Sequence, residues 1–357
     1  MALKVVEIKS LDQINEYKKI ISDFEITDPY AQFDFIETFD KGISNLISFI
    51  FITDNAKIVM PGYLNPIKID GKETGYFDFI TPYGYTGPFY SKNTSSSDVE
   101  AFWVAVDQWH SENNVVSEFI RFNLFGNEAA YSGKTVPTML NIRGEILEEE
   151  VQWKSFDQKV RKNVNRAKRE LLTSKVFYQD IEDAIISEFH DIYIQTMIRT
   201  QAKQNFFYSF EQFKSFINNN NKHAAICTIY FEEKAISSEL LLVSDDAIYS
   251  FLGGTDEQFF DKRPNDFLKV EALNWARAHD KKYYVLGGGY GFEDGIFKYK
   301  KSFFPNDVVS YSTGRKILNQ TIYNNLVAQT SEYRKSIGLE ELDPSDESFF
   351  PLYNKQN

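Results

Sequence analysis

The chain has 357 residues, of which 43% are hydrophobic and 25% are charged. This is ordinary globular composition, and the length predicts about two domains. A formal net charge of −12 argues against a protein that coats nucleic acid, so we expect no DNA partner. The single cysteine, Cys227, excludes an internal disulfide and fits a reducing compartment.

The N-terminal residues have no apolar core of signal-peptide length. The most apolar run, "LISFIFI", is far shorter than the roughly 18 residues that a membrane span needs. We therefore expect a cytoplasmic protein without a transmembrane segment.

Hydrophobic periodicity and turn signals predict alternating strands and helices in both halves of the chain. In the first half the expected elements are a strand at 3–8, helices at 11–24 (opened by Ser10), 34–42 and 95–112, and strands at 46–54, 56–64 and 117–125. In the second half they are strands at 224–233, 235–245, 247–255 and 281–289 and a helix at 267–280.

The order of hairpin strands, glycine-rich turn, helix and strand thus occurs twice. We interpret the chain as two similar α/β (α+β) domains, 1–150 and 151–311, with the boundary after the acidic run "EILEEE". Residues 312–357 are expected to pack back on the first domain, through the aromatic side chains of the acidic tail. A single larger α/β domain is the alternative.

A basic segment lies between the halves. Residues 154–169 contain seven basic residues, Arg166 among them, and one acidic residue. Val160, Val164, Ala167 and Leu171 form an apolar stripe at helical spacing. The segment is either the solvated face of an amphipathic helix or a phosphate-binding surface, since arginine and lysine pair with phosphate oxygens.

Two further segments combine aromatic rings with polar groups. In "TMIRTQAKQNFFY", Arg199 and the following aromatics form either a cradle for a charged, ring-bearing ligand or an ordinary helical hairpin. In "TPYGYTGPFY", Tyr83 and Tyr85 offer hydroxyls on rigid arms, although the segment also fits a simple turn-rich hairpin.

Several catalytic signatures are missing from the sequence. The four histidines have no metal-ligand spacing, and there is neither a G-x-S-x-G elbow nor a P-loop. "LGGGYG" follows a strand but does not open a helix, so it is not a dinucleotide fingerprint. We expect no metal and no tightly bound cofactor.

The run "GIFKYKKSFFP" places Lys298, Lys300 and Lys301 among four aromatic residues. A fixed cation in a poorly hydrated slot stabilises a developing oxyanion more than it stabilises a neutral carbonyl. The alternative for these lysines is a solvated edge hairpin.

Six segments of the sequence, taken in chain order, resemble those of the Fem-type (FemABX) non-ribosomal peptidyltransferases. They are "YGYTGP", "RKNVNRAK", "TMIR", "PNDFL", "YYVLGGG" and "YKKSFFP". The resemblance covers nearly the whole chain and implies two tandem domains of the GCN5-related N-acetyltransferase (GNAT) fold, with mixed, mostly antiparallel sheets flanked by helices. It also implies that Lys300 is the catalytic lysine near the reacting carbonyl. Arg199 and Tyr249 match residues that hold the acceptor, and Tyr83, Tyr85, Arg166 and Lys301 are further substrate-binding candidates.

The function implied is transfer of an acyl or aminoacyl group onto an amine of a bacterial cell-envelope precursor of the peptidoglycan type. Acceptors of the resembled enzymes are nucleotide-linked precursors, and the co-substrate is aminoacyl-tRNA or acyl-coenzyme A. No glycine follows Arg263 in "DKRPNDFLK", which disfavours coenzyme A.

Alternatives are an acyl-coenzyme A-dependent N-acyltransferase on an amino sugar of capsule or lipopolysaccharide, and a non-catalytic module that binds a nucleotide-linked sugar. For the general base, the candidates are Asp78, Glu239 and the leaving group itself.

Overall fold

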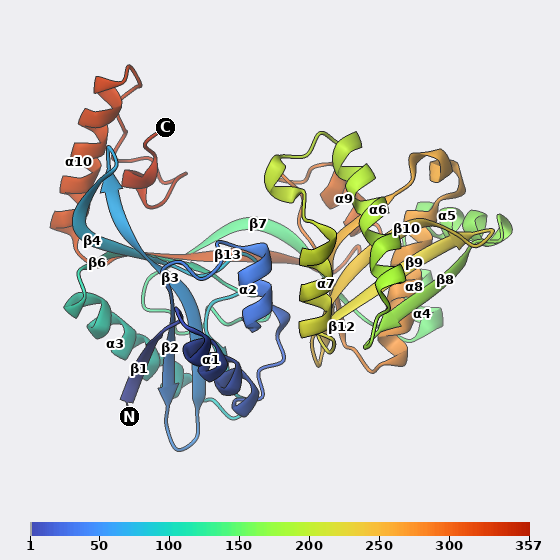
Figure 1. Ribbon diagram of the computed structural model, residues 1–357, viewed down its shortest axis with the longest axis horizontal. Helices are drawn as coiled ribbons and strands as arrows, with labels where there is room; N and C mark the ends of the chain where they lie inside the picture. The colour runs from blue at the N-terminus through green and yellow to red at the C-terminus, as the bar shows by residue number, and fades with distance from the viewer. Residues whose placement is uncertain (1) are drawn as a thin grey trace. The chain divides into compact units, whose positions relative to one another are not determined.

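The computed structural model describes residues 2–357, which divide into two compact units (Figure 1). Unit 1 comprises residues 1–26, 30–138 and 311–357, and unit 2 comprises 27–29 and 139–310. The chain enters unit 2 at Met139, within strand β7, whereas we placed the boundary at residue 150. The difference arises because Ile142–Glu145 of β7 pair with a strand of unit 2.

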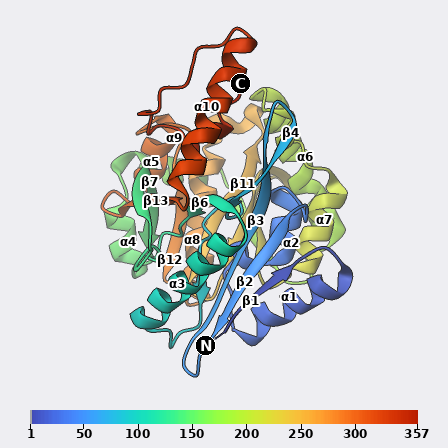
Figure 2. The same cartoon turned by 90° about the vertical axis from the view of Figure 1, so that its left-hand side faces the viewer.

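The strands of unit 1 pair in the order β1-β2-β3-β4-β6-β13, and β5 pairs with β3. Their bounds are β1 Ala2–Glu7, β2 Leu46–Ile52, β3 Lys57–Ile69, β4 Lys72–Ile80, β5 Phe89–Tyr90, β6 Val115–Arg121 and β13 Val308–Ile317. The helices are α1 Leu11–Asp23, α2 Phe33–Phe39, α3 Ser96–Glu112 and α10 Gln320–Ser336, with short 3-10 turns at Pro29–Ala31 and Leu352–Asn354. Figure 2 shows α3 and α10 beside these strands.

The strands of unit 2 pair in the order β7-β12-β11-β10-β9-β8. Their bounds are β7 Lys134–Glu145, β8 Thr173–Tyr178, β9 Ala224–Phe231, β10 Lys234–Val243, β11 Ala247–Thr255 and β12 Tyr283–Gly287. The helices are α4 Glu149–Ser155, α5 Gln158–Arg169, α6 Asp183–Arg199, α7 Phe210–Asn219, α8 Pro264–Ala278 and α9 Gly295–Lys301, with 3-10 turns at Gln204–Phe206 and Glu257–Lys262.

Both units have the same connectivity. Four antiparallel strands, β1 to β4 and β8 to β11, are followed by a helix, α3 or α8, which crosses to a strand parallel to the fourth. An antiparallel partner, β13 or β7, then pairs with that parallel strand. The predicted repeat and the predicted class, mixed and mostly antiparallel sheets flanked by helices, are confirmed.

Local sequence explains where the helices begin and end. Ser10 and Ser95 cap α1 and α3, each in a reciprocal capping box with the residue three positions later, which satisfies amides that the helix leaves unpaired. The predicted apolar stripe of α5 is buried at Val160, Val164 and Ala167. Leu171 is an exception. The helix ends before it, and Leu171 is 80% exposed with φ 58°.

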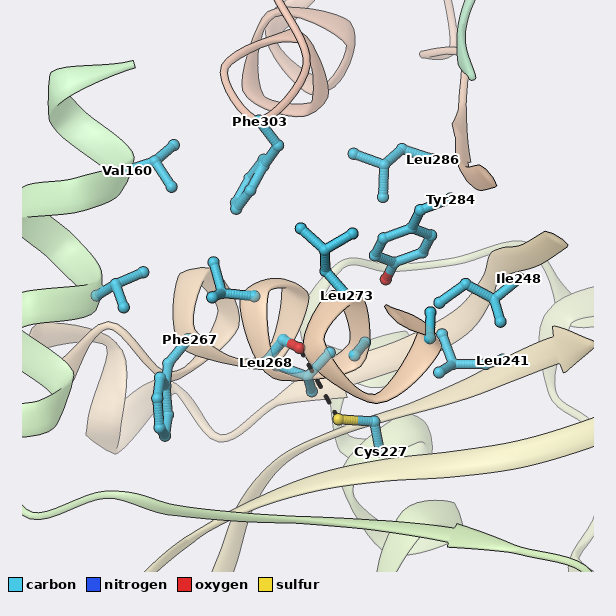
Figure 3. Close-up of a cluster of buried hydrophobic side chains, with 14 of the residues drawn as sticks. Val160, Cys227, Leu241, Ile248, Phe267, Leu268, Leu273, Tyr284, Leu286 and Phe303 are labelled. Carbon is cyan, nitrogen blue, oxygen red and sulfur yellow. Dashed lines mark hydrogen bonds between the residues drawn. The ribbon is translucent and has the colours of Figure 1, made fainter. Parts of the chain in front are cut away.

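The core of unit 2 packs α5 and α8 on the sheet (Figure 3). Cys227 lies in this core, completely buried, with its sulfur 3.8 Å from the carbonyl oxygen of Leu268. Burial raises the pKa of the thiol, and a protonated, inaccessible thiol is inert. Cys227 is therefore a packing residue.

Unit 1 buries an unusual polar pair in its core. Glu118 and His110 are both fully buried, with the His110 Nδ1 3.6 Å from the Glu118 Oε2. Burial raises the pKa of Glu118 to about 8 and lowers that of His110 to about 3. Both groups are therefore neutral at pH 7, and the Tyr131 hydroxyl donates to the protonated Glu118 at 2.9 Å.

We expect Glu118→Gln to remove a pH dependence of stability. Between pH 4.5 and about 8 the native state keeps a proton that the unfolded state releases, so the wild-type free energy of unfolding falls as pH rises. The variant should match wild type near pH 4.5 and be more stable near pH 8, as measured by urea unfolding. A constant difference at all pH values would show that Glu118 is ionised in the native state.

Candidate active site at the parting of two strands

The parallel strands β11 and β12 pair over only three residues. Their ladder joins Ala247–Tyr249 to Tyr283–Val285, whereas β11 continues along β10 as far as Thr255. Beyond Tyr249 the two strands no longer pair. A parallel sheet that opens in this way leaves space at the carboxyl ends of the strands, where ligands bind in open α/β sheets.

Lys300 lies at this opening. It sits in the last turn of α9, and its Nζ donates to the carbonyl oxygen of Gly288, just after β12, at 2.7 Å. The segment predicted as a loop or edge hairpin is thus a short helix. Asp294 caps it by accepting from the Phe297 amide at 2.8 Å and also holds the preceding loop through the amides of Tyr290 and Gly291.

The Lys300 ammonium forms no ion pair with any carboxylate of residues 2–357. Burial and, to a lesser extent, the positive charge of Lys269 lower its pKa to about 8, while Glu239 and Asp294 act in the opposite direction. The group therefore remains mostly protonated at pH 7. It is a cation held in a poorly hydrated place by a neutral carbonyl.

A buried polar network lies beside it. Lys269 of α8 and Glu239 of β10 are 7% and 6% exposed and form an ion pair at 2.5 Å. The Lys269 Nζ also donates to the Ser250 hydroxyl at 2.7 Å, and the Tyr284 hydroxyl donates to Glu239 at 3.4 Å. Ser250 is the first residue of β11 beyond the ladder, so the network fills the base of the opening.

Sequence reasoning missed Lys269, Ser250 and Tyr284. One signal was available, because Lys269 interrupts an otherwise apolar run, Phe267 to Val270, which is buried. A lysine on the buried face of a helix needs an anionic partner. The sequence does not reveal that this partner is Glu239 of β10, which precedes Lys269 by 30 residues in the chain.

The comparisons with known proteins agree with this architecture. Residues 158–301 match the family model "Acetyltransferase (GNAT) domain". Residues 158–301 are therefore similar to a GNAT domain. The structure also resembles the crystal structure of FemX, with a TM-score of 0.62 and 12% identity over 90% of this chain and 99% of that one.

Two other solved structures are similar. L-PGS from Bacillus licheniformis gives a TM-score of 0.55 at 11% identity, covering 88% of this chain and 94% of that one. A conserved protein of unknown function from Bacteroides thetaiotaomicron gives a TM-score of 0.55 at 10% identity, covering 88% and 99%. A search of curated protein sequences finds no match. The chain has the fold of these proteins.

The GNAT domain contains Lys300, Lys301, Arg199, Tyr249 and Arg166, whereas Tyr83 and Tyr85 belong to unit 1. Arg199 is exposed at the end of α6, with its guanidinium 4.9 Å from the centre of the Phe260 ring. Tyr249 is buried on β11, and its hydroxyl donates to Asp28 at 3.4 Å. Lys301 is half-buried beside Lys300.

Arg166 is already engaged with acidic groups on the GNAT domain surface. It lies 3.5 Å from Asp261 and 4.0 Å from Glu170, and Lys262 also binds Glu170 at 2.8 Å. This network links α5 to the segment before α8, so Arg166 has a structural role, and its predicted substrate-binding role stays a prediction. Lys162, Lys168 and Arg169 of α5 remain exposed.

In unit 1, Tyr83 is 53% exposed, whereas Tyr85 packs against the rings of Tyr30 and Tyr311 at 5.3 and 5.7 Å. Gly84 between them has φ 101°, and a Cβ there would lie 2.2 Å from the Tyr30 ring. The turn therefore requires glycine and holds Tyr85 in a packed position.

The candidate bases differ in their surroundings. Glu239 is engaged by Lys269, Ser250 and Tyr284. Asp78 lies in unit 1, where it accepts from Asn65 and Asn354, and burial raises its pKa. Within residues 2–357, no cluster of histidine, cysteine and carboxylate side chains fits a metal ion, and no helix is long and apolar enough to cross a membrane.

We expect Glu239→Gln to destabilise the protein strongly, by about 3–5 kcal/mol, because it leaves the buried Lys269 charge without an anion. The double variant Glu239→Gln with Lys269→Met removes both charges and should regain part of this loss. Urea unfolding of both single variants and the double variant measures the coupling. Strict additivity of the single effects would contradict a direct interaction.

Proposed function

We propose that this protein is an acyltransferase that moves an acyl or aminoacyl group onto an amine through a tetrahedral intermediate stabilised by Lys300. The observation that carries the proposal is the Lys300 ammonium, which is partly buried at the strand opening of the GNAT-like stretch and bound to a neutral carbonyl. Burying a cation without a carboxylate costs stability. Such a cost is typical of functional sites.

The chemistry follows from charge development. When an amine attacks the carbonyl carbon of an ester or thioester, the carbonyl oxygen becomes an oxyanion. A fixed ammonium stabilises this oxyanion more than it stabilises the neutral carbonyl, and the low local dielectric strengthens the effect. Collapse of the intermediate forms the amide bond and expels the alkoxide or thiolate.

The proton released by the attacking amine must also be placed. The Glu239 carboxylate already accepts hydrogen bonds from the Lys269 ammonium and from the Ser250 and Tyr284 hydroxyls, so its oxygens are engaged within the network. We propose that the departing oxygen or sulfur takes the amine proton, so that the step balances without a protein base.

For the acceptor we propose a nucleotide-linked cell-envelope precursor, following the resemblance of the sequence to the Fem-type enzymes. Arg199 supports this assignment because its guanidinium is exposed and stacked on Phe260, an arrangement suited to a carboxylate or phosphate. Tyr249, Lys301, Arg166, Tyr83 and Tyr85 are proposed to complete the substrate contacts.

For the donor we favour an aminoacyl ester, as in charged tRNA, over acyl-coenzyme A. The first turn of α8 would have to bind the coenzyme pyrophosphate through its amides. There the Asp266 carboxylate accepts from Asn163 at 3.1 Å, and Asp266 is partly buried. A carboxylate at this position opposes a pyrophosphate, whereas the exposed lysines and arginine of α5 favour an extended polyanion.

We expect Lys300→Ala to lower the rate of acyl transfer by on the order of 10²-fold or more while substrate binding is kept. Lys298→Ala is the matched control, because Lys298 is exposed on the same helix, and it should retain wild-type turnover. Single-turnover transfer measures the rate. A Lys300→Ala enzyme with the wild-type rate would disprove the catalytic role.

Removal of the Lys300 charge should raise the stability of the protein, although it lowers the rate of acyl transfer. Because the pKa of Lys300 falls from 10.5 to about 8 on folding, the buried charge costs stability below pH 8 and this cost disappears as pH rises toward 10.5. Lys300→Met should therefore raise the melting temperature at pH 7. A purely structural lysine would give a lower melting temperature in the variant.

The pH dependence of turnover provides a third test. Only the protonated lysine stabilises the oxyanion, so transfer should decline as pH rises through about 8. Lys300→Arg keeps its charge at higher pH, and the decline should move upward in that variant even if its rate is lower. An identical decline in both proteins would assign the titration to another group.

The donor is tested by melting temperature with and without saturating acetyl-coenzyme A, since a ligand that binds only the native state stabilises it. We expect no rise, and we expect transfer from charged tRNA. A clear rise would favour an N-acyltransferase that acts on amino sugars. Binding of a nucleotide-linked sugar without transfer from either donor would indicate a binding module.

A further inference from the structure

The C-terminal segment of unit 1 forms an arch that is anchored at both ends. The first anchor is next to α10, where Arg334 donates to the Glu340 carbonyl at 2.8 Å and the Leu342 amide donates to the Ser331 hydroxyl at 3.0 Å. These polar contacts go beyond the aromatic packing expected from the sequence.

The second anchor lies at residues 352–354. The Leu352 amide donates to the Tyr323 hydroxyl at 2.9 Å, and Thr330 donates to the Tyr353 carbonyl at 3.1 Å. The Tyr353 and Ser117 hydroxyls lie 2.6 Å apart, and both groups are buried. Residues 343–349 therefore span between two fixed points.

A cavity of about 1110 Å³ lies between α10 and this arch. Its floor is apolar, consisting of Ile317, Tyr323, Val327, Leu342, Phe350 and Leu352. The volume is slightly above the range of about 300–1,000 Å³ that ligand pockets occupy. An apolar floor with polar groups around it suits a ligand that has an apolar and a polar part.

The charges around the cavity are mostly neutralised in pairs. Glu347 binds Lys134 at 2.8 Å, Glu341 binds Lys335 at 2.7 Å, and Asp346 binds Lys355 at 3.0 Å. One more carboxylate, Glu332, is exposed at the rim. Each of the carboxylates of Glu347, Glu341 and Asp346 is therefore paired with a lysine.

Arg315 is the exception among the cations that line the cavity. Its Nη1 donates to the backbone carbonyl of Glu347 at 2.6 Å, and its Nε is buried without a hydrogen-bond partner. Across residues 2–357 it forms no ion pair with a carboxylate. The Arg315 side chain lines the cavity and is only partly buried, so its guanidinium would pair with an anion there through nitrogens other than the buried Nε.

We propose that this cavity binds an amphipathic organic anion, with an acyl chain on the apolar floor and a carboxylate or phosphate on Arg315. The site lies wholly in unit 1 and is separate from the Lys300 site of unit 2. The proposal is therefore independent of acyl transfer.

The first experiment titrates the full chain with laurate, dodecyl phosphate and dodecyltrimethylammonium in a calorimeter. We expect one site for each anion and none for the cation of equal chain length. Equal binding of the cation, or no binding of either anion up to its solubility limit, would overturn the proposal.

Two variants locate the site. Arg315→Gln should weaken anion binding by about tenfold or more, whereas Arg315→Lys should restore part of it. Ala328→Trp, at an exposed position of α10 that lines the cavity, should block binding by filling the space. The matched controls are Lys92→Gln and Val104→Trp, which change exposed residues elsewhere in unit 1, and both should bind normally.

Melting temperatures establish that each variant is folded. If Ala328→Trp fails to fold, anion binding by Arg315→Gln alone tests the proposal. Unchanged binding in Arg315→Gln would overturn the assignment. Flotation with phosphatidylcholine vesicles, with and without phosphatidic acid, identifies the source of the anion. Binding that requires phosphatidic acid and Arg315 supports a membrane lipid, and binding of the soluble anions alone supports a free one.

Discussion

The feature on which the proposed chemistry depends is a partly buried lysine ammonium that has no carboxylate partner. Lys300 lies between a neutral carbonyl and the buried Lys269–Glu239 pair. Burial and the charge of Lys269 make its protonated state less favourable, whereas Glu239 and Asp294 make it more favourable. The balance leaves a cation near neutral pH whose interactions are incomplete until an anion develops beside it.

The strand geometry creates the place for this cation. The ladder between β11 and β12 ends after three residue pairs, and the opening would expose polar groups on both strands if nothing filled its base. The base of the opening is filled by four side chains that hydrogen-bond to one another, those of Lys269, Glu239, Ser250 and Tyr284. A fully connected buried network is rigid, so it gives Lys300 a fixed support.

The two units share one connectivity but bury different polar groups. Unit 2 keeps an ion pair and a protonated lysine at its strand opening, whereas unit 1 buries the neutral Glu118 and His110. Unit 1 adds α10 and the C-terminal arch, which enclose a cavity with the incompletely bonded Arg315. The same fold therefore presents two chemically distinct candidate sites, one suited to a developing oxyanion and one to a stable anion.

The sequence by itself determined the local elements and much of the plan. Periodicity and capping predicted α1, α3, α5 and the repeated order of strands, because these signals depend on neighbours within one or two turns. The lysine run among aromatics indicated a cationic segment, and the resemblance to the Fem-type enzymes implied Lys300 within it. Only the tertiary structure decided that Lys269 meets Glu239, that Tyr85 is packed while Tyr83 is exposed, and that the acidic tail arches over a cavity. Those outcomes depend on contacts between residues distant in the chain, for which a single sequence carries no periodic signal.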